Sequence, residues 1–256
     1  MKTCEHPTLP WTITFDPDEH EYRDQENRRY ISGTGLVRRS FPEFDEIAAA
    51  NRVAKRENRL AIEVLSEWGL KAQESSEYGM RVHAFAEALI LGQQTPPATS
   101  LRDRRAFNIV RKAMPMLRDT YNFLTPEQII FDPLYRVAGT IDLPAINKKN
   151  GKLAILDWKT CEGITEQSFG MALDPIAHVP DNKVNHYALQ LSIYAWVMTH
   201  PEYTSYPSKG MDVELALIHI QHECPDPIWR PVPYLRDEAT AVVMKWVEDA
   251  KKEMEA

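Results

Sequence analysis

The 256-residue sequence predicts an α/β fold, in which helices flank a small mixed central sheet and further helices fill the N-terminal half. Side chains along 137–143 alternate as in a strand with one buried face, and a continuous apolar run occupies 153–156. Helical periodicity before and after these strands predicts the flanking helices. A chain of this length supports one well-buried core, or at most two small domains, and we expect a single domain over 1–256.

The N-terminal half is expected to contain a hairpin followed by helices. Residues 11–34 predict a short hairpin with a charged turn at 24–27, within a lead-in over 1–44 to a helical part over 45–125. One helix ends at Gly92, because glycine favours the left-handed conformation at a helix C-terminus. Three helices are predicted here, over 44–72, 76–91 and 101–121.

The C-terminal half is expected to hold the sheet. Asn150 and Gly151 tolerate positive φ and form a strong hairpin signal between two strands. Residues 161–182 lack periodicity, and we interpret this long connection as a substrate-facing lid. Four strands are predicted, over 126–132, 135–144, 152–160 and 211–221, the last after a turn through Pro201 and Pro207. Helices are predicted over 183–199 and 235–254, within segments that span 126–221 and 222–256.

Two acidic residues and a lysine stand at the ends of adjacent predicted strands. Asp142 lies on the first strand, and Asp157 and Lys159 share one face of the second, because side chains alternate with a period of two. Magnesium prefers oxygen ligands, which the two carboxylates and the carbonyl of Trp158 supply. Lys159 is placed to orient or deprotonate a water and to stabilise negative charge. The groups are typical of metal-dependent nucleases; the alternative is an exposed hairpin with an Asp/Lys ion pair.

Two predicted helices carry polar pairs with a four-residue spacing, which places both members of a pair on one helix face. His83 and Glu87 form one pair, and Gln190 and Tyr194 form the other. Ordinary packing between helix faces is the alternative for both pairs, because a histidine alone on a helix is more often structural than a ligand.

Four motifs follow one another in the chain, namely Gly79…His83, Gly139…Asp142, Asp157-Trp158-Lys159-Thr160 and Gln190…Tyr194. In order and rough spacing they resemble the RecB-like branch of the PD-(D/E)xK nuclease superfamily, in particular phage-type exonucleases and the mitochondrial genome-maintenance exonuclease. That branch shows a Gly-x-x-x-His helix, a Gly-x-x-Asp strand, an Asp-x-Lys-Thr strand and a Gln-x-x-x-Tyr helix. The chain matches over about 76–200, and segments within 13–36 resemble the lead-in of several phage members.

The resemblance implies a restriction-endonuclease-like core with a helical N-terminal embellishment, and it implies roles for the matching positions. The catalytic residues would be Asp142, Asp157, Lys159, Gln190 and Tyr194, and the metal ligands His83, Asp142, Asp157 and the carbonyl of Trp158. Gln190 and Tyr194 would contact the substrate or brace the catalytic strand. Supporting candidates are Glu87, Glu127 and Thr160. Trp158 departs from the smaller hydrophobic residue usual at its position, which requires its ring to pack on the opposite face.

Composition restricts the cofactor and the compartment. Cys4, Cys161 and Cys224 cannot form the four-cysteine cluster of some RecB-like nucleases, so we predict Mg²⁺ or Mn²⁺ and no iron–sulfur cluster. No apolar run approaches the ~18 residues of a membrane span, and the N-terminus lacks the apolar core of a signal peptide. We therefore expect no membrane partner and a cytoplasmic protein, in the bacterial host if the chain is phage-encoded.

The formal net charge of −7 is a weak objection to binding of nucleic acid, because a local basic groove can act within an acidic protein. Clustered arginines are candidates for contacts with DNA phosphates, and a solvated helix face is the alternative. The DNA-binding candidates are Arg38, Arg39, Arg102, Arg104 and Arg105.

The function predicted on these grounds is a metal-dependent DNA exonuclease. It would hydrolyse phosphodiester bonds from single- or double-stranded ends by direct attack of water, in phage or mobile-element recombination or DNA processing. A single-strand annealing or recombination protein is the expected protein partner. The first alternative is an endonuclease of the same superfamily, for restriction, defence or flap and branch cleavage. The second is a non-catalytic DNA-binding subunit, which the intact acidic positions disfavour.

Overall fold

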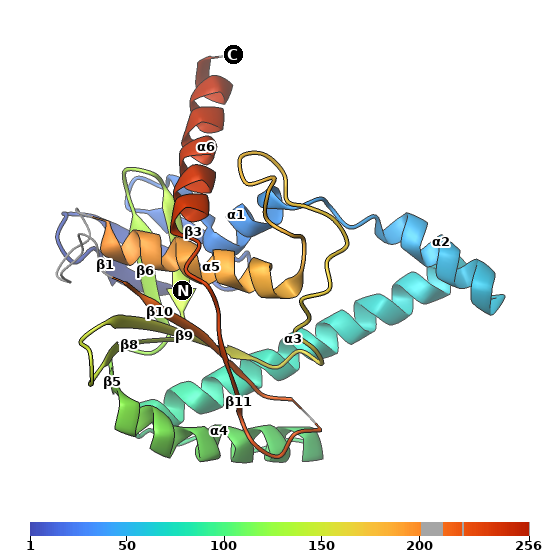
Figure 1. The fold of residues 1–256 in the computed structure, drawn as a ribbon, viewed down its shortest axis with the longest axis horizontal. Coiled ribbons are helices and arrows are strands. Elements are labelled where there is room, and N and C mark those ends of the chain that lie inside the picture. Colours follow the sequence, from blue (N-terminus) through green and yellow to red (C-terminus); the bar gives the residue numbers. More distant parts are fainter. Residues whose placement is uncertain (201–211, 222, 256) are drawn as a thin grey trace.

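The computed structural model describes residues 1–200, 212–221 and 223–255, and it has two mixed sheets with helices between and around them (Figure 1). The helices are α1 (Gly33–Ser40), α2 (Glu46–Glu57), α3 (Ala61–Leu91), α4 (Leu101–Thr120), α5 (Lys183–Thr199) and α6 (Arg236–Glu255). The first seven strands are β1 (Lys2–Glu5), β2 (Thr12–Asp16), β3 (Glu21–Asp24), β4 (Arg29–Ser32), β5 (Tyr121–Phe123), β6 (Gln128–Asp132) and β7 (Val137–Ile141). The others are β8 (Leu143–Asn147), β9 (Leu153–Lys159), β10 (Glu214–His219) and β11 (Ile228–Pro231). The α/β class is confirmed.

The strands divide between two sheets, where the sequence predicted one. One sheet has the order β1-β2-β3-β4-β7-β6 and the other the order β11-β10-β9-β8-β5. Each contains one parallel pair, β4 with β7 and β9 with β10, and the remaining pairs are antiparallel. The predicted strand 135–144 was wrong in one respect. It bends at Asp142, so that β7 belongs to the first sheet and β8 to the second.

Helix α5 packs between the two sheets and forms the centre of the largest core. It contacts β6 and β7 on one side and β9 and β10 on the other. Its side chains are apolar around almost the whole circumference, which is what a helix buried on all sides requires. The predicted helices at 183–199, 101–121 and 235–254 are confirmed as α5, α4 and α6.

Strand β9 separates two cores by the alternation of its side chains. Leu153 and Ile155 point into the core around α5, whereas Ala154, Leu156 and Trp158 point into a second core formed with α3 and α4. This second core includes the stacked rings of Phe85 and Phe107. The odd-numbered positions of β9 therefore face α5, and this face continues through Asp157 and Lys159.

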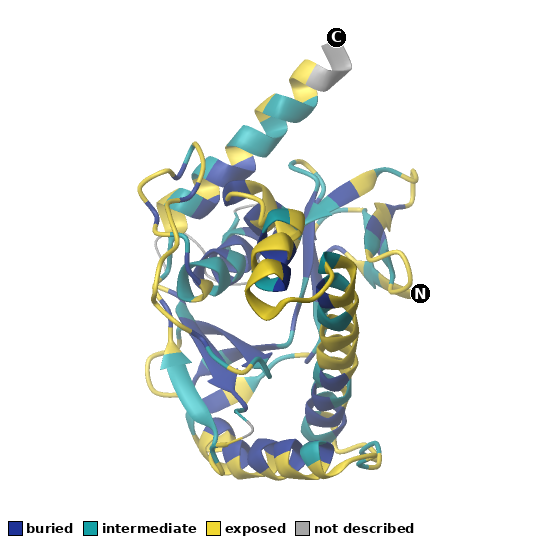
Figure 2. Cartoon of the chain, turned by 90° about the vertical axis from the view of Figure 1, so that its right-hand side faces the viewer, coloured by how far each residue is buried: buried dark blue, intermediate teal, exposed yellow. Residues whose placement is uncertain are grey.

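Helix α3 runs without a break through the point where two helices were predicted. The predicted boundary near 72–76 is wrong, because the break lies at Asn58, whose left-handed conformation (φ 50°) ends α2. The N-terminal part of α3 and the whole of α2 project from the body as an arm (Figure 1). Most of this arm is exposed (Figure 2), and its small core around Ala50, Ala54 and Val64 is separate from the other cores.

The N-terminal lead-in is a meander rather than a single hairpin. The predicted charged turn joins β3 to β4, but a second turn at 17–20 joins β2 to β3, and α1 follows directly after β4. The short strands β1, β5 and β11 were not predicted, because three or four residues at a sheet edge carry little periodic signal.

The hairpin between β8 and β9 turns at the expected residues, with Gly151 at φ 71°. The predicted strand 211–221 is present as β10, which extends the sheet beside β9; the predicted turn through Pro201 and Pro207 lies outside the described residues. The connection 161–182 contains no regular strand or helix, and Ile164, Ala172 and Ile176 anchor it in the core around α5. Among the described residues, no helix is both long and apolar enough to cross a membrane.

Candidate active site

Asp142 occupies the bend at which the chain leaves the first sheet and enters the second. The β8–β9 register pairs Leu143 with Leu156, so the next step places Asp142 opposite Asp157. The backbone N–H of Trp158 donates to Asp142 Oδ2 at 2.8 Å, and the backbone N–H of Glu127 donates to the Asp142 carbonyl at 2.9 Å. Both the side chain and the backbone of Asp142 are therefore held by neighbouring strands.

Asp157 and Lys159 form an ion pair on the α5 face of β9. Lys159 Nζ lies 2.6 Å from Asp157 Oδ2, as expected for residues two apart on a strand, and 4.7 Å from the ring centre of Tyr187 on α5. Asp157 is 3% exposed, so this pair is not the exposed ion pair of the alternative interpretation. Trp158 points the other way and packs in the second core, as its unusual position in the motif requires.

His83 reaches this bend from α3. Its Nδ1 lies 3.3 Å from Asp142 Oδ2 and 3.5 Å from Glu127 Oε1, and its Nε2 lies 3.0 Å from the Trp158 carbonyl oxygen. One ligand atom each from His83, Glu127 and Asp142 lies within 4.8 Å of the others. We call these three residues, together with Asp157 and Lys159, the acidic cluster.

Glu127 was only a supporting candidate from the sequence, and the structure places it directly against His83. Glu127 precedes β6 at a positive φ of 48°, a strained conformation for glutamate that tends to occur at functional sites. Glu87, the other acidic candidate, is one turn from His83, and no side chain in the described part of the chain forms a hydrogen bond or ion pair with it. Its charge nevertheless adds to the rise in the pKa of Glu127.

Burial and charge act in opposite directions on the pKa values of the acidic cluster. Burial raises the pKa of Asp157 to about 6; Lys159 opposes this shift and the charge of Asp142 adds to it. Burial also raises the pKa of Glu127. Burial alone would lower the pKa of His83, but Asp142 and Glu127 hold it well above its usual range. A protonated His83 therefore supplies positive charge between the two carboxylates.

The donor atoms fit a divalent cation. His83, Glu127 and Asp142 bring their ligand atoms together, and Asp157 lies outside this group of three. Carboxylates, an imidazole and the nearby Trp158 carbonyl are the ligand types that Mg²⁺ and Mn²⁺ accept. Oδ2 of Asp157 is buried, and apart from its ion pair with Lys159 it accepts no hydrogen bond from any described residue. A cation would compensate both the burial of these ionised carboxylates and the repulsion between them.

Tyr194 fixes the position of β7 through its ring. A Cβ atom on Gly139 would lie 2.4 Å from Tyr194 Cε1, and one on Gly33 would lie 2.5 Å from the same atom, so the ring fits only against glycine on both sides. Gln190 Nε2 donates to Tyr194 Oη at 3.1 Å. This pair, which the sequence placed beside the site as substrate contact or brace, is arranged as a brace.

A second close approach holds the end of β9 against α3. A Cβ atom on Gly79 would lie 3.4 Å from Thr160 Oγ1, so α3, one turn before His83, lies against the residue that follows β9. Tyr187 lies beside the site, over Lys159, but was not predicted from the sequence. It lies one turn before Gln190 on α5, and this spacing could have indicated it.

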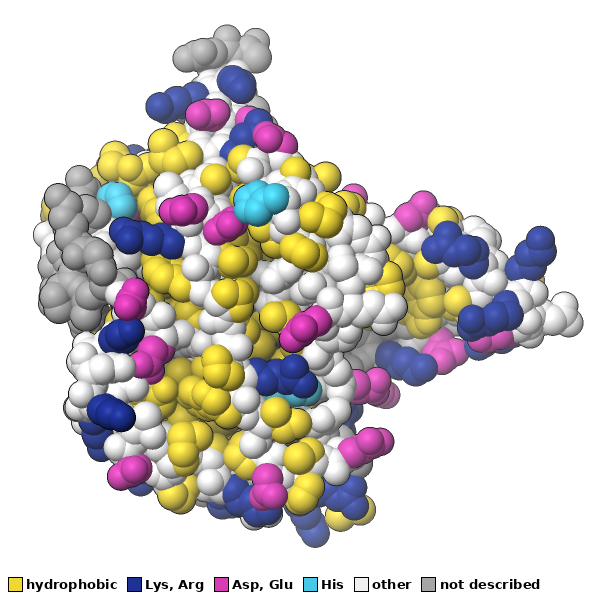
Figure 3. Space-filling model, in the orientation of Figure 1, with side chains coloured by type: hydrophobic (Ala, Val, Ile, Leu, Met, Phe, Trp, Pro, Cys, Tyr) yellow, Lys and Arg dark blue, Asp and Glu magenta, His cyan; other side chains and the backbone are white. Residues whose placement is uncertain are grey.

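The arginine candidates for DNA binding do not form one patch. Arg38 and Arg39 lie on α1, where Arg38 pairs with Glu43 and Arg39 lies over the ring of Trp246. The others lie on α4: Arg102 covers the ring of Tyr78, and Arg104 and Arg105 are exposed. On the face in Figure 3, basic and acidic side chains are interspersed.

Comparison with known families gives one match: the model of the PD-(D/E)XK nuclease superfamily matches residues 53–256. A search among curated proteins gives no match. The matched range contains every residue of the acidic cluster.

Proposed function

Since the chain belongs to the PD-(D/E)XK nuclease superfamily, we propose that it is a divalent-metal-dependent deoxyribonuclease whose active site is the acidic cluster. The observation that supports this most strongly is the position of Asp142 opposite Asp157, with Lys159 and His83 in contact with these carboxylates. These side chains come from a helix and two strands and meet at one buried point, which ordinary packing of helix faces does not explain.

The proposed ligands are His83, Glu127, Asp142, Asp157 and the carbonyl of Trp158. A Mg²⁺ or Mn²⁺ ion held there supplies Lewis acidity and neutralises charge on the scissile phosphate. His83 would have to be neutral to act as a ligand, so its raised pKa would oppose metal binding. Glu127 replaces the more distant Glu87 as the additional acidic ligand in this proposal.

Lys159 acts as a cation in the proposed mechanism. Burial alone would lower its pKa, but Asp157 and Asp142 raise it above the usual value. A protonated lysine orients the attacking water and stabilises negative charge on the phosphate. Water attacks directly, with no covalent intermediate, and Tyr194 with Gln190 keeps β7 in place behind Asp142.

Within the superfamily we propose an exonuclease of the RecB-like branch, acting on DNA ends in phage or mobile-element recombination. The support is the order of the four motifs and the presence of both His83 and the Gln190/Tyr194 pair. An annealing or recombination protein would take up the single strand produced. We also propose that 1–256 is one nuclease domain, because the acidic cluster draws on elements of both sheets.

The test uses end-labelled linear DNA, single- and double-stranded, together with closed circular DNA, in magnesium, manganese or chelator. We expect metal-dependent loss of linear DNA with intact circles, and no loss with Asp157→Ala. Cleaved circles would replace the exonuclease by an endonuclease of the same superfamily. No cleavage with either metal would contradict the proposed activity.

A further inference from the structure

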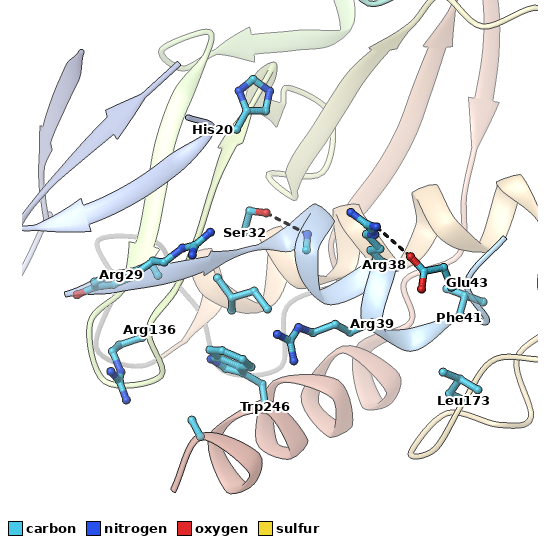
Figure 4. A pocket seen from close by; sticks show the side chains of 14 residues that line it. His20, Arg29, Ser32, Arg38, Arg39, Phe41, Glu43, Arg136, Leu173 and Trp246 are labelled. Atoms are coloured by element: carbon cyan, nitrogen blue, oxygen red, sulfur yellow. Dashed lines mark hydrogen bonds and ion pairs between the residues drawn. The ribbon is translucent and has the colours of Figure 1, made fainter. Parts of the chain in front are cut away.

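A second charged site lies beside α1, away from the acidic cluster. It is a cavity of about 900 Å³ with walls from the 17–20 turn, β4, α1, the turn between β6 and β7, and α6. One acidic residue lines it, Glu43, and one tryptophan, Trp246. Four arginines line it, namely Arg29, Arg38, Arg39 and Arg136. We call this cavity the arginine pocket (Figure 4).

Two of the four guanidinium groups are not neutralised. Arg29 pairs with Glu21 at 2.8 Å and Arg38 pairs with Glu43 at 3.2 Å. Within the described ranges, Arg39 and Arg136 have no carboxylate within ion-pair distance; Arg39 lies over the Trp246 ring at 5.1 Å. Figure 4 shows Arg39 beside this indole and Arg136 on its other side. In a protein of net charge −7, such a concave basic surface is suited to an anionic ligand.

The backbone around the arginine pocket is strained in a way that also occurs at the acidic cluster. Apart from glycine and asparagine, three described residues have positive φ: His20 (54°), Glu127 (48°) and Arg136 (52°). Glu127 belongs to the acidic cluster, and the other two line the arginine pocket. Left-handed backbone in residues other than glycine and asparagine is uncommon and clusters at active sites and ligand-binding sites.

Strand β7 connects the two sites. Arg136 directly precedes β7 and Asp142 directly follows it, a separation of roughly 20 Å at about 3.3 Å per residue. The carbonyl of Arg136 accepts a hydrogen bond from Ile31 of β4, so this arginine is tied to the sheet. A separation of this size lies within the reach of a few nucleotides of one DNA strand.

We propose that the arginine pocket binds the DNA strand whose phosphodiester is cleaved in the acidic cluster, a few nucleotides from the scissile bond. Arg39 and Arg136 contact phosphates, and the Arg39–Trp246 pair provides a flat surface on which a base stacks. The inference rests on the proposed nuclease function, which supplies the DNA, but the pocket binds DNA without metal.

The experiment measures binding of a fluorescent single-stranded 20-mer in chelator, by anisotropy at several salt concentrations. With Arg39→Gln/Arg136→Gln we expect at least tenfold weaker binding. The slope of log K against log salt should fall by about 1.4, since each lost phosphate contact on a single strand removes about 0.7. The matched control is Arg52→Gln/Lys55→Gln, which removes the same charge from exposed positions on α2.

Wild-type affinity in the pocket variant, or an equal loss in the control, would overturn the arginine pocket as a DNA site. Calorimetric titration with Mn²⁺ reports on the acidic cluster separately. Absence of Mn²⁺ binding, together with the expected loss of DNA affinity in the pocket variant, would overturn the metal-dependent function and support the pocket.

Discussion

Asp157 is a buried carboxyl whose ionisation costs stability when no metal is bound. Its pKa is raised from 3.8 to about 6, so its contribution to folding is fully present below pH 3.8 and is lost as the pH rises through 6. In chelator, Asp157→Asn should therefore match the wild type only below pH 3.8 and exceed it at pH 7.5 by at most about 3 kcal/mol. Thermal unfolding measures this difference, and a gap that is independent of pH would contradict the assignment.

Lys159 should matter for the rate and not for the metal. Because the protonated amine stabilises charge that develops in the transition state, Lys159→Ala should lower kcat by roughly 10²–10³-fold. Calorimetry should show Mn²⁺ affinity close to that of the wild type. Single-turnover cleavage gives the rate, and a variant with unchanged turnover would remove Lys159 from the mechanism.

Glu127 and Glu87 form a matched pair for testing the metal ligands. Glu127 lies 3.5 Å from His83, whereas Glu87 contributes only its charge to the neighbourhood. We expect Glu127→Gln and His83→Ala each to weaken Mn²⁺ binding at least tenfold, and Glu87→Gln to weaken it little. If Glu87→Gln has the larger effect, the ligand set proposed here is wrong.

At the scale of elements, the contact between Tyr194 and Gly139 decides where β7 lies relative to α5. Gly139→Ala would bring a methyl group into steric overlap with the Tyr194 ring. This overlap should lower the free energy of unfolding by about 1–3 kcal/mol. Gly163→Ala is the control, because its added Cβ meets no atom within 4 Å. Urea unfolding of both variants compares them directly; equal stability would show that the ring moves aside.

Tyr194→Phe separates the ring from its hydroxyl. This variant loses only the hydrogen bond from Gln190, which is worth about 1 kcal/mol, and it keeps the ring between the two glycines. Its stability and activity should both remain closer to the wild type than those of Gly139→Ala.

At the scale of the whole molecule, the arm of α2 and the first turns of α3 should be the least protected helical part. Its core is small and separate from the core around α5. Hydrogen exchange followed by mass spectrometry should show amides of 46–72 exchanging much faster than those of 188–198. Equal protection would mean that the arm unfolds only together with the body.

The parts of the fold that depend on local periodicity and short motifs could be predicted from the sequence. Asp142 comes close to Asp157 and Lys159 because strand alternation and one hairpin turn determine their positions, and their catalytic roles stay predictions. The division into two sheets was not accessible, because it depends on a bend at Asp142 held by hydrogen bonds from distant backbone groups. The continuous α3 was missed because Asn58, and not a glycine or proline, ends the helix before it.

The bend at Asp142 joins the two sheets, and each sheet also needs a strand from a distant part of the chain. β7 needs β4 from the N-terminal part, and β9 receives its parallel neighbour β10 only after residue 214. Asp157 and Tyr194 therefore follow most of the first sheet in the chain, and the second sheet gains its parallel pair only once β10 has been made. During synthesis the acidic cluster is completed well after the N-terminal strands that hold β7.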